Sequence, residues 1–343
     1  MNTRRVPMSL LLAVPLFAGT ILAADAPHRV LRRIPIGGEG GWDYLTADPE
    51  RHRLFVTHGT QVEVVDLVRD SVAGRIPDAP GVHGVALSPE TGHGFVSEGR
   101  DSTVTMFDLG TLAVLRREPV PARNPDAIVS DPASRRVFTF GGGSRNAVAL
   151  DARTDSVVGA VPLPGKPEFA VVDGSGRLFV NLEDSSAVVV LDTGSLKILG
   201  RWPLAPGEEP TGLAIDRAHH RLFAGCGNQK LVVLDSGSGR VVASAPIGQG
   251  VDAVVFDDAR QLVAASCGDG TLIVLHEDAP DTFRALAPVV TERGARTCAL
   301  DPATGVIYTA TADFGPPPAP TADRPHPRPS IVPGTFRLLA VGN

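Results

Sequence analysis

The chain alternates short apolar runs with polar turns, and one such pattern occurs seven times. In each copy a polar residue, the opening residue, precedes a short apolar run that leads to Asp or Ser, and a second apolar run follows, as in WDYLTADPERHRLFVTH and PDAIVSDPASRRVFTFG, where the polar residue is the second letter. The opening residues stand 40 to 44 positions apart and are Asp43, His83, Asp126, Glu168, Thr211, Asp252 and Arg296. Pairs of short strands repeated at this interval are typical of propeller blades.

Two further strands complete each unit. The third is β-branched and alternating, as in QVEVVDL, and the fourth runs into a turn, as in SVVGAVPLPGKP. Near the N-terminus, HRVLRRIPIGG matches a fourth strand that lacks its predecessors, while TFRLLAVG near the C-terminus matches a third strand that lacks a successor. We therefore expect an all-β, seven-bladed β-propeller with four antiparallel strands per blade, forming one domain over residues 27–343. The N-terminal strand should close its last blade.

The VVD-type third strands, the DP turns and the RLFV second strands resemble those of the YVTN-repeat, YncE-like seven-bladed propellers of bacterial envelopes. The resemblance covers essentially all of the chain after residue 26. It implies the propeller fold and an envelope location. It leaves the activity open, because such propellers include binding scaffolds as well as lactonases and lyases.

Residues 1–26 combine Arg4 and Arg5 with an apolar run and small residues near Ala23 to Ala26, which predicts a cleaved secretory signal peptide; a membrane anchor is the alternative. We expect a periplasmic or secreted monomer whose mature chain has no membrane span. The formal charge of −6 disfavours non-specific binding of nucleic acid or anionic lipid. With 37 Gly and 30 Pro in 343 residues, the chain should contain many turns and no long helices.

Because the first strand of a propeller blade lines the central channel, the seven opening residues should form a ring at one mouth. Fifteen residues after each of them, the second strand ends on the same face, farther from the axis. These positions hold His58, Glu98, Gly141, Glu183, Cys226, Cys267 and Thr311. The two rings together predict a polar ligand site that includes Asp43, Asp126, Glu168, Thr211, Asp252, Glu98 and Glu183.

The rings contain the side chains that a metal site needs. Carboxylates offer the hard oxygen ligands that Ca²⁺, Mg²⁺ and Mn²⁺ prefer, whereas His83 and His58, joined by Glu98 or Cys226, would favour Zn²⁺ or copper. The predicted set for one divalent ion is Asp43, His83, Asp126, Glu168 and Asp252. The alternative is that these carboxylates cap strand ends, bind water and pair with Arg296.

Two functions remain open on this basis, and a third, a redox carrier or partner of an electron-transfer protein, rests only on Cys226, Cys267, His58 and His83. The first is a binding protein or scaffold that recognises a small polar ligand, a metal ion or an envelope protein partner at the channel mouth. The second is a metal-dependent, lactonase-like hydrolase or lyase, with His83 or His58 as base and Arg296 steadying an anionic substrate or intermediate. The sequence contains no G-x-S-x-G elbow, H-E-x-x-H helix, P-loop or dinucleotide fingerprint, which favours binding.

Three further features carry predictions. The Pro-rich insertion at residues 313–333 should cross or rim the mouth as a lid that brings Arg324, His326 and Arg328 over the carboxylates, unless it is a disordered surface tract. Cys226 and Cys267 occupy equivalent positions in adjacent blades and could pack, form a disulfide or bind metal, whereas Cys298 should lie in the core. His219 and His220 fall in a turn on the opposite face and should be exposed.

Overall fold

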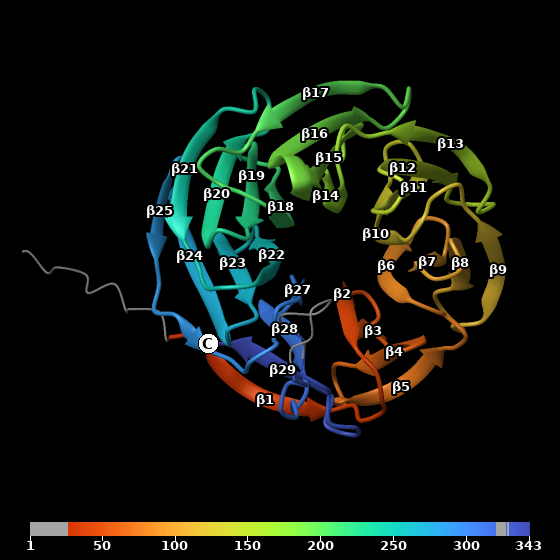
Figure 1. The fold of residues 1–343 in the computed structure, drawn as a ribbon, viewed down its shortest axis with the longest axis vertical. Helices are drawn as coiled ribbons and strands as arrows, with labels where there is room; N and C mark the ends of the chain where they lie inside the picture. The colour runs from red at the N-terminus through yellow and green to blue at the C-terminus, as the bar shows by residue number, and fades with distance from the viewer. Residues whose placement is uncertain (1–26, 320–326, 328) are drawn as a thin grey trace, which may run out of the picture.

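The computed structural model describes residues 27–319, 327 and 329–343, and over these the chain forms seven β-sheets arranged as blades around one axis (Figure 1). Blades one to six begin with the innermost strand and run outward in chain order. The innermost strands are β2 (Trp42–Asp48), β6 (Val82–Ser88), β10 (Pro125–Asp131), β14 (Pro167–Val172), β18 (Pro210–Asp216), β22 (Val251–Asp257) and β27 (Cys298–Asp301). The predicted seven-bladed all-β fold is confirmed.

The second, third and fourth strands follow by antiparallel pairing. The second strands are β3 (Arg53–His58), β7 (His93–Glu98), β11 (Arg136–Gly141), β15 (Arg177–Leu182), β19 (Arg221–Cys226), β23 (Leu262–Cys267) and β28 (Val306–Thr311). The third strands are β4 (Gln61–Asp66), β8 (Thr103–Asp108), β12 (Asn146–Asp151), β16 (Ala187–Asp192), β20 (Lys230–Asp235), β24 (Thr271–Ala279) and β29 (Arg337–Gly342). The outer strands of blades one to five are β5 (Ser71–Ile76), β9 (Val114–Pro119), β13 (Val157–Pro162), β17 (Ile198–Pro203) and β21 (Val241–Pro246).

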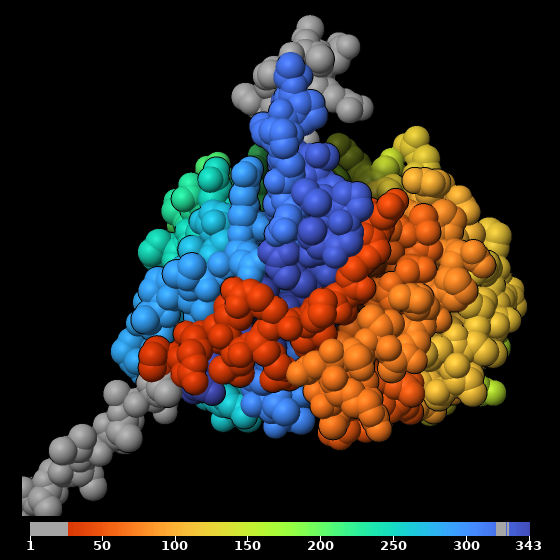
Figure 2. Space-filling model, turned by 90° about the horizontal axis from the view of Figure 1, so that it is seen from below, coloured from red at the N-terminus to blue at the C-terminus, as the bar shows by residue number. Residues whose placement is uncertain are grey.

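The seventh blade takes its outer strand from the other end of the chain. Strand β1 (Arg29–Pro35) pairs antiparallel with β29, so that Arg29 stands opposite Gly342. In Figure 2 this first strand, in red, lies against the blue C-terminal strands. The predicted closure is confirmed, and it removes the open sheet edges that would otherwise be available for pairing with other chains. The predicted signal peptide, residues 1–26, lies outside the described residues.

Blade six departs from the common plan. Its third strand β24 has nine residues and pairs with two short outer strands, β25 (Thr282–Ala285) and β26 (Val289–Val290). Beyond strands, the described residues contain one short 3₁₀ helix, η1 (Glu183–Ser185), and they contain no helix that is long and apolar enough to cross a membrane.

The core lies between neighbouring blades because both faces of each sheet are covered. The second and third strands are buried on both faces, as near-continuous apolar runs predict. Aromatic pairs join adjacent blades: the rings of Phe55 and Phe107 lie 5.6 Å apart, and those of Phe223 and Phe256 lie 5.1 Å apart. Burial of such side chains contributes about 1.5–3 kcal/mol each and holds the ring rigid around its channel.

Arginines at the starts of second strands also join blades. The Nη1 atoms of Arg53, Arg136 and Arg177 donate to turn carbonyls of the next blade, at 3.0 Å to Leu109, 2.8 Å to Gly194 and 3.1 Å to Ser236. Because a guanidinium group offers several donors in a fixed plane, one arginine side chain can hydrogen-bond to the carbonyls of a turn and thereby link its own blade to the next.

Candidate ligand site at the channel mouth

The opening residues of blades one to six lie at a β-bulge that recurs at the same position in each blade. In each of these blades the strand pairing is shifted directly after the first residue of the inner strand, for example between Trp42 and Leu45 and between Pro125 and Ile128. A β-bulge bends a strand and redirects a side chain. The bulge therefore turns the opening side chain, half-buried in every case, toward the channel.

Buried hydroxyl groups from the second strands hold these bulges. Thr57 Oγ1 accepts the N–H of Asp43 at 3.2 Å and donates to the carbonyl of Tyr44 at 3.1 Å. Ser97 accepts the N–H of Gly84 at 3.0 Å and donates to the carbonyl of Asp126 at 2.5 Å. The sequence signal for this role is a hydroxyl residue inside an otherwise apolar second strand.

The channel mouth contains a pocket of about 370 Å³. Six of the seven predicted opening residues line it, and His83, which is not among the lining residues, contacts Asp43 and Asp126. The lining residues are Asp43, Tyr44, Asp126, Lys166, Glu168, Glu183, Thr211, Gly250, Val251, Asp252 and Arg296.

One side of the pocket joins the first three blades through His83. Its Nδ1 lies 2.7 Å from Asp43 Oδ2 and 3.5 Å from Asp126 Oδ1. Burial opposes protonation of His83, but the hydrogen bond with Asp43 and the charge of Asp126 raise its pKa to about 9. Burial and the neighbouring carboxylates outweigh the charge of His83 and raise the pKa of Asp126 to about 7.

The neighbouring part of the ring, in blade four, is organised by Lys166, which is not among the predicted ring residues. Its Nζ donates to Glu168 Oε1 at 2.6 Å and also to Glu183. Burial raises the pKa of Glu168 to about 8, against the lowering effect of Lys166. The second strand of blade four pairs one residue earlier than in the other blades, Pro167 with Leu182, which leaves Glu183 to turn inward in η1.

Arg296 completes the ring. Its Nε donates to Asp252 Oδ2 at 2.5 Å, and its Nη2 lies 4.0 Å from Asp43 Oδ1. Thr211 donates its hydroxyl to the carbonyl of Val251 at 2.7 Å, which ties blade five to blade six at the pocket wall. The contacts of Arg296 with Asp252 and Asp43 match the alternative in which the ring carboxylates pair with Arg296.

After these contacts the site still has more acidic side chains than cationic ones. Five carboxylates, those of Asp43, Asp126, Glu168, Glu183 and Asp252, meet three cationic side chains, His83, Lys166 and Arg296. Asp126 Oδ1 is buried and accepts no hydrogen bond from the described residues. Burial and four of these carboxylates also raise the pKa of Tyr44 well above its ordinary value, as expected next to excess negative charge.

Several predicted members do not reach the pocket. His58 is 2% exposed and stacks on Phe336 with ring centroids 4.1 Å apart, and burial lowers its pKa. Its placement as a base was wrong, because a side chain packed between aromatic and backbone atoms cannot reach a ligand in the channel. Glu98 is 1% exposed and accepts hydrogen bonds from Thr103 and Thr105 beside a separate cavity of blade two.

The outer-ring cysteines also point away from the site. Cys226, Cys267 and Cys298 are all buried free thiols. No disulfide joins Cys226 to Cys267 in the described chain, so the disulfide alternative is wrong and packing accounts for both. The remaining outer-ring positions are structural: Thr311 donates to the carbonyl of Arg293 at 2.7 Å, and Gly141 lies tightly against Ser144.

The described part of the insertion stands above one face of the ring beside the mouth (Figure 2). Phe314 and Ile331 form a bridge, and with Trp42, Arg293 and Arg296 they line a second cavity of about 290 Å³. Arg296 is shared by both cavities, which connects the insertion with the axial pocket. Arg324, His326 and Arg328, predicted to lie over the carboxylates, are outside the described residues.

Comparisons with solved structures agree with this fold. The WD40 repeats of RRP9 match with a TM-score of 0.75 at 11% identity, covering 93% of this chain and 98% of that one. U3-55K matches with a TM-score of 0.74 at 10% identity, covering 92% and 98%. Kuenenia stuttgartiensis hydrazine synthase matches with a TM-score of 0.70 at 13% identity, covering 86% and 96%. At these identities the likeness concerns the fold alone.

No protein-family model matches the chain, and no curated protein sequence is significantly similar to it. The propeller fold implied by the resemblance to YVTN-repeat proteins is confirmed, whereas membership of that family stays a prediction.

Proposed function

We propose that this propeller is an exported binding protein whose channel mouth takes a small ligand carrying positive charge, either a divalent cation or a compact organic amine. The observation that supports this most directly is the convergence of five carboxylates on three cations around one pocket. A bound cation would balance the excess charge. It would also replace the protons that Asp126 and Glu168 hold when their pKa values lie at about 7 and about 8.

If a cation displaces these protons, ligand binding is accompanied by proton release. Near neutral pH the ligand must displace protons from Asp126 and Glu168, so its affinity should increase as pH rises toward 9. Tyr44 supplies an aromatic surface to the pocket lining, and Thr211 and Gly250 contribute uncharged surface to it. The pocket is large enough for a small organic ligand, which would use these neutral surfaces for specificity.

Isothermal titration calorimetry with Ca²⁺, Mn²⁺ and Zn²⁺, and separately with putrescine, would test the proposal in two buffers that differ in ionisation enthalpy. We expect saturable binding with proton release. Asp126→Asn and Glu168→Gln should each weaken it at least tenfold, whereas Glu50→Gln, an exposed carboxylate outside the pocket, should not. Absence of saturable binding for every probe between pH 6 and pH 9 would overturn the proposal.

A second candidate is the metal-dependent hydrolase or lyase, and one observation favours it. The donor atoms of Asp43, His83 and Asp126 all lie within 4.8 Å of one another, close enough to hold one ion. His83 would then serve as ligand and not as base, while Arg296, with its Nη2 4.0 Å from Asp43, would steady developing negative charge. Metal-dependent turnover of a lactone panel, abolished by a chelator and by His83→Gln, would favour this candidate over simple binding.

A further inference from the structure

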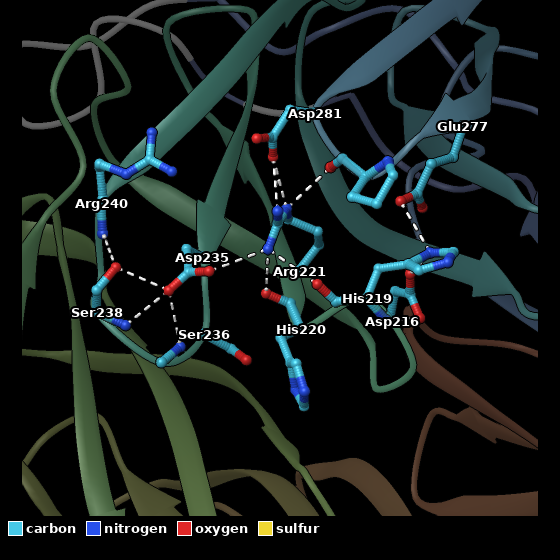
Figure 3. Close-up of polar contacts among 12 residues, drawn as sticks. Asp216, His219, His220, Arg221, Asp235, Ser236, Ser238, Arg240, Glu277 and Asp281 are labelled. Carbon is cyan, nitrogen blue, oxygen red and sulfur yellow. Dashed lines mark hydrogen bonds and ion pairs between the residues drawn. The ribbon is translucent and has the colours of Figure 1, made fainter.

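A second cluster of ligand-type side chains lies away from the channel mouth, between blades five and six (Figure 3). Asp216 ends strand β18, His219 follows in the turn toward β19, and Glu277 comes from the long third strand β24 of blade six. The imidazole of His219 lies between the two carboxylates (Figure 3). The side chain of His219 is partly exposed, as predicted, but it has carboxylate partners, because the long strand β24 brings Glu277 against it.

The donor atoms are closely spaced. His219 Nδ1 lies 2.7 Å from Asp216 Oδ2 and 3.2 Å from Glu277 Oε1, and all three donors are within 4.8 Å of one another. A tetrahedral ion with ligands at about 2.0–2.2 Å would separate its ligand atoms by about 3.3–3.6 Å. The His219–Glu277 distance is therefore close to that of a coordination shell, whereas Asp216 Oδ2 would have to move about 0.6–0.9 Å away from His219 Nδ1.

Glu277 provides independent support for a ligand at this place. Its side chain is fully buried; Oε1 lies 3.2 Å from His219 Nδ1 without hydrogen-bond geometry, and Oε2 accepts no hydrogen bond from the described residues. Asp216 Oδ2 and His219 Nδ1, 2.7 Å apart, also lack a well-oriented hydrogen bond there, so one buried donor atom from each of the three residues lies within 4.8 Å of the others. Burying polar groups with poorly oriented hydrogen bonds is costly, and a metal ion would satisfy one atom of each residue at once.

The surrounding contacts hold the ligands in place. Asp216 Oδ1 accepts the N–H groups of Ala218 and His219 at 2.9 and 3.2 Å, which leaves Oδ2 free to face the cluster. Arg221 anchors the strand that carries Glu277, because its Nε donates to the carbonyl of Pro280 and to Asp281 Oδ1, both at 2.8 Å (Figure 3). Metal sites commonly depend on such outer contacts for ligand orientation.

We propose that Asp216, His219 and Glu277 form a structural site for one divalent transition-metal ion, for which Zn²⁺ is the probe, and that this ion staples blade five to blade six. One nitrogen and two carboxylate oxygens suit Zn²⁺, and water would complete the tetrahedron. The side chain of His219 is 38% exposed, which gives the ion a path from solvent. The site is separate from the axial pocket, so it stands whether or not the proposed cation binding there is correct.

The experiment measures metal content and melting temperature of the full protein after chelation and reconstitution with Zn²⁺. We expect this site to contribute one equivalent of Zn²⁺ and a raised melting temperature in the wild type. Both should be lost in Glu277→Gln and His219→Asn and kept in His220→Asn, which changes the exposed neighbouring histidine. Asp126→Asn, run in parallel, should retain this equivalent and would lose only ions bound in the axial pocket.

Co²⁺ provides a measurement on the wild type that does not depend on variant folding. Bound at this site, it should show the visible absorption of tetrahedral coordination without thiolate charge transfer, and His219→Asn should abolish that absorption. Wild-type protein that binds no Zn²⁺ or Co²⁺ would overturn the proposal. So would Zn²⁺ that is lost in Asp126→Asn and retained in Glu277→Gln. The cluster would then be a protonated histidine shared by two carboxylates.

Discussion

His83 Nδ1 lies 2.7 Å from Asp43 Oδ2, so that an imidazole from blade two neutralises a carboxylate from blade one at the channel mouth. The next carboxylate, Asp126 of blade three, is 3.5 Å from the same nitrogen. One cation is thus shared by two acids, and the second acid is ionised at a cost.

Asp126 should make the protein less stable as pH rises. Its pKa is raised from 3.8 to about 7, so the folded state binds the proton more tightly than the unfolded state, and stability falls between about pH 4 and pH 7. His83 adds to this trend, because the stability gained from its raised pKa is lost as pH rises through about 9. Urea titrations from pH 4 to pH 10 should show the decline. Asp126→Asn should reduce it below pH 7, and an unchanged profile in that variant would contradict the assignment.

Asp155 offers a site where a neutral substitution should stabilise the fold. It is fully buried, neither of its oxygens accepts a hydrogen bond from the described residues, and burial raises its pKa from 3.8 to about 8. Its φ of 57° is one that Asn tolerates. Asp155→Asn should gain about 1–3 kcal/mol at pH 8 and little at pH 4. Asp151→Asn is the control: it should destabilise, because Asp151 accepts the N–H groups of Arg153 and Thr154.

Lys166 should oppose ligand binding while it stabilises the empty site. Removing its charge in Lys166→Met leaves Glu168 and Glu183 to repel each other, which should cost about 1–2 kcal/mol at pH 9 and less at pH 6, where Glu168 holds its proton. Under the proposed function the same variant should bind a cationic ligand more tightly. Calorimetry and urea unfolding measure the two effects, with Lys197→Met at an exposed position as control. Weaker binding would mean that Lys166 contacts the ligand directly.

Arg136 tests the inter-blade arginines. Its Nη1 donates to the carbonyls of Thr193 and Gly194 in blade four, so Arg136→Ala should lose about 1.5–3 kcal/mol in chemical unfolding. The exposed Arg153 makes no such bridge in the described chain, and Arg153→Ala should stay within about 0.5 kcal/mol of wild type. Equal losses in the two variants would show that charge, and not the bridge, matters.

The three cysteines should be inert in the folded protein. Burial raises the pKa values of Cys226, Cys267 and Cys298 to about 12, 11 and 12, which leaves almost no thiolate at neutral pH. A thiol reagent should therefore label none of them at pH 8 under native conditions and all three in denaturant. Rapid native labelling of Cys226 or Cys267 would restore a redox or metal role for that residue.

The fold could be predicted from the sequence because each blade repeats one apolar pattern, and the unmatched strands at the two ends specified the closure. The inner ring could also be predicted, since the start of a channel-lining strand has only one mouth to face. Lys166 lies two residues before Glu168. The residue at the same position, two before the opening residue, is glycine in the copies that contain Asp43, His83 and Asp252. That departure from the repeat was the available signal for its role.

The remaining errors have local causes. His58 and Glu98 end second strands as predicted, but the bulges redirect only the first-strand residues, and the second-strand ends pack between blades. Glu183 enters the site because blade four pairs one residue earlier. The partnership of His219 with Glu277 depends on the extended hairpin of blade six, which has no counterpart in the repeat.

The pairing of β1 with β29 brings together strands more than 300 positions apart in the chain. During synthesis the first of these strands leaves the ribosome long before its partner exists, so the ring cannot be sealed while translation continues. Blades one to six can form in order from local hairpins, whereas the last seam waits for a contact of very high sequence separation. A truncated chain that stops before residue 337 would therefore remain an unclosed arc with an exposed strand edge, open to pairing with a second chain.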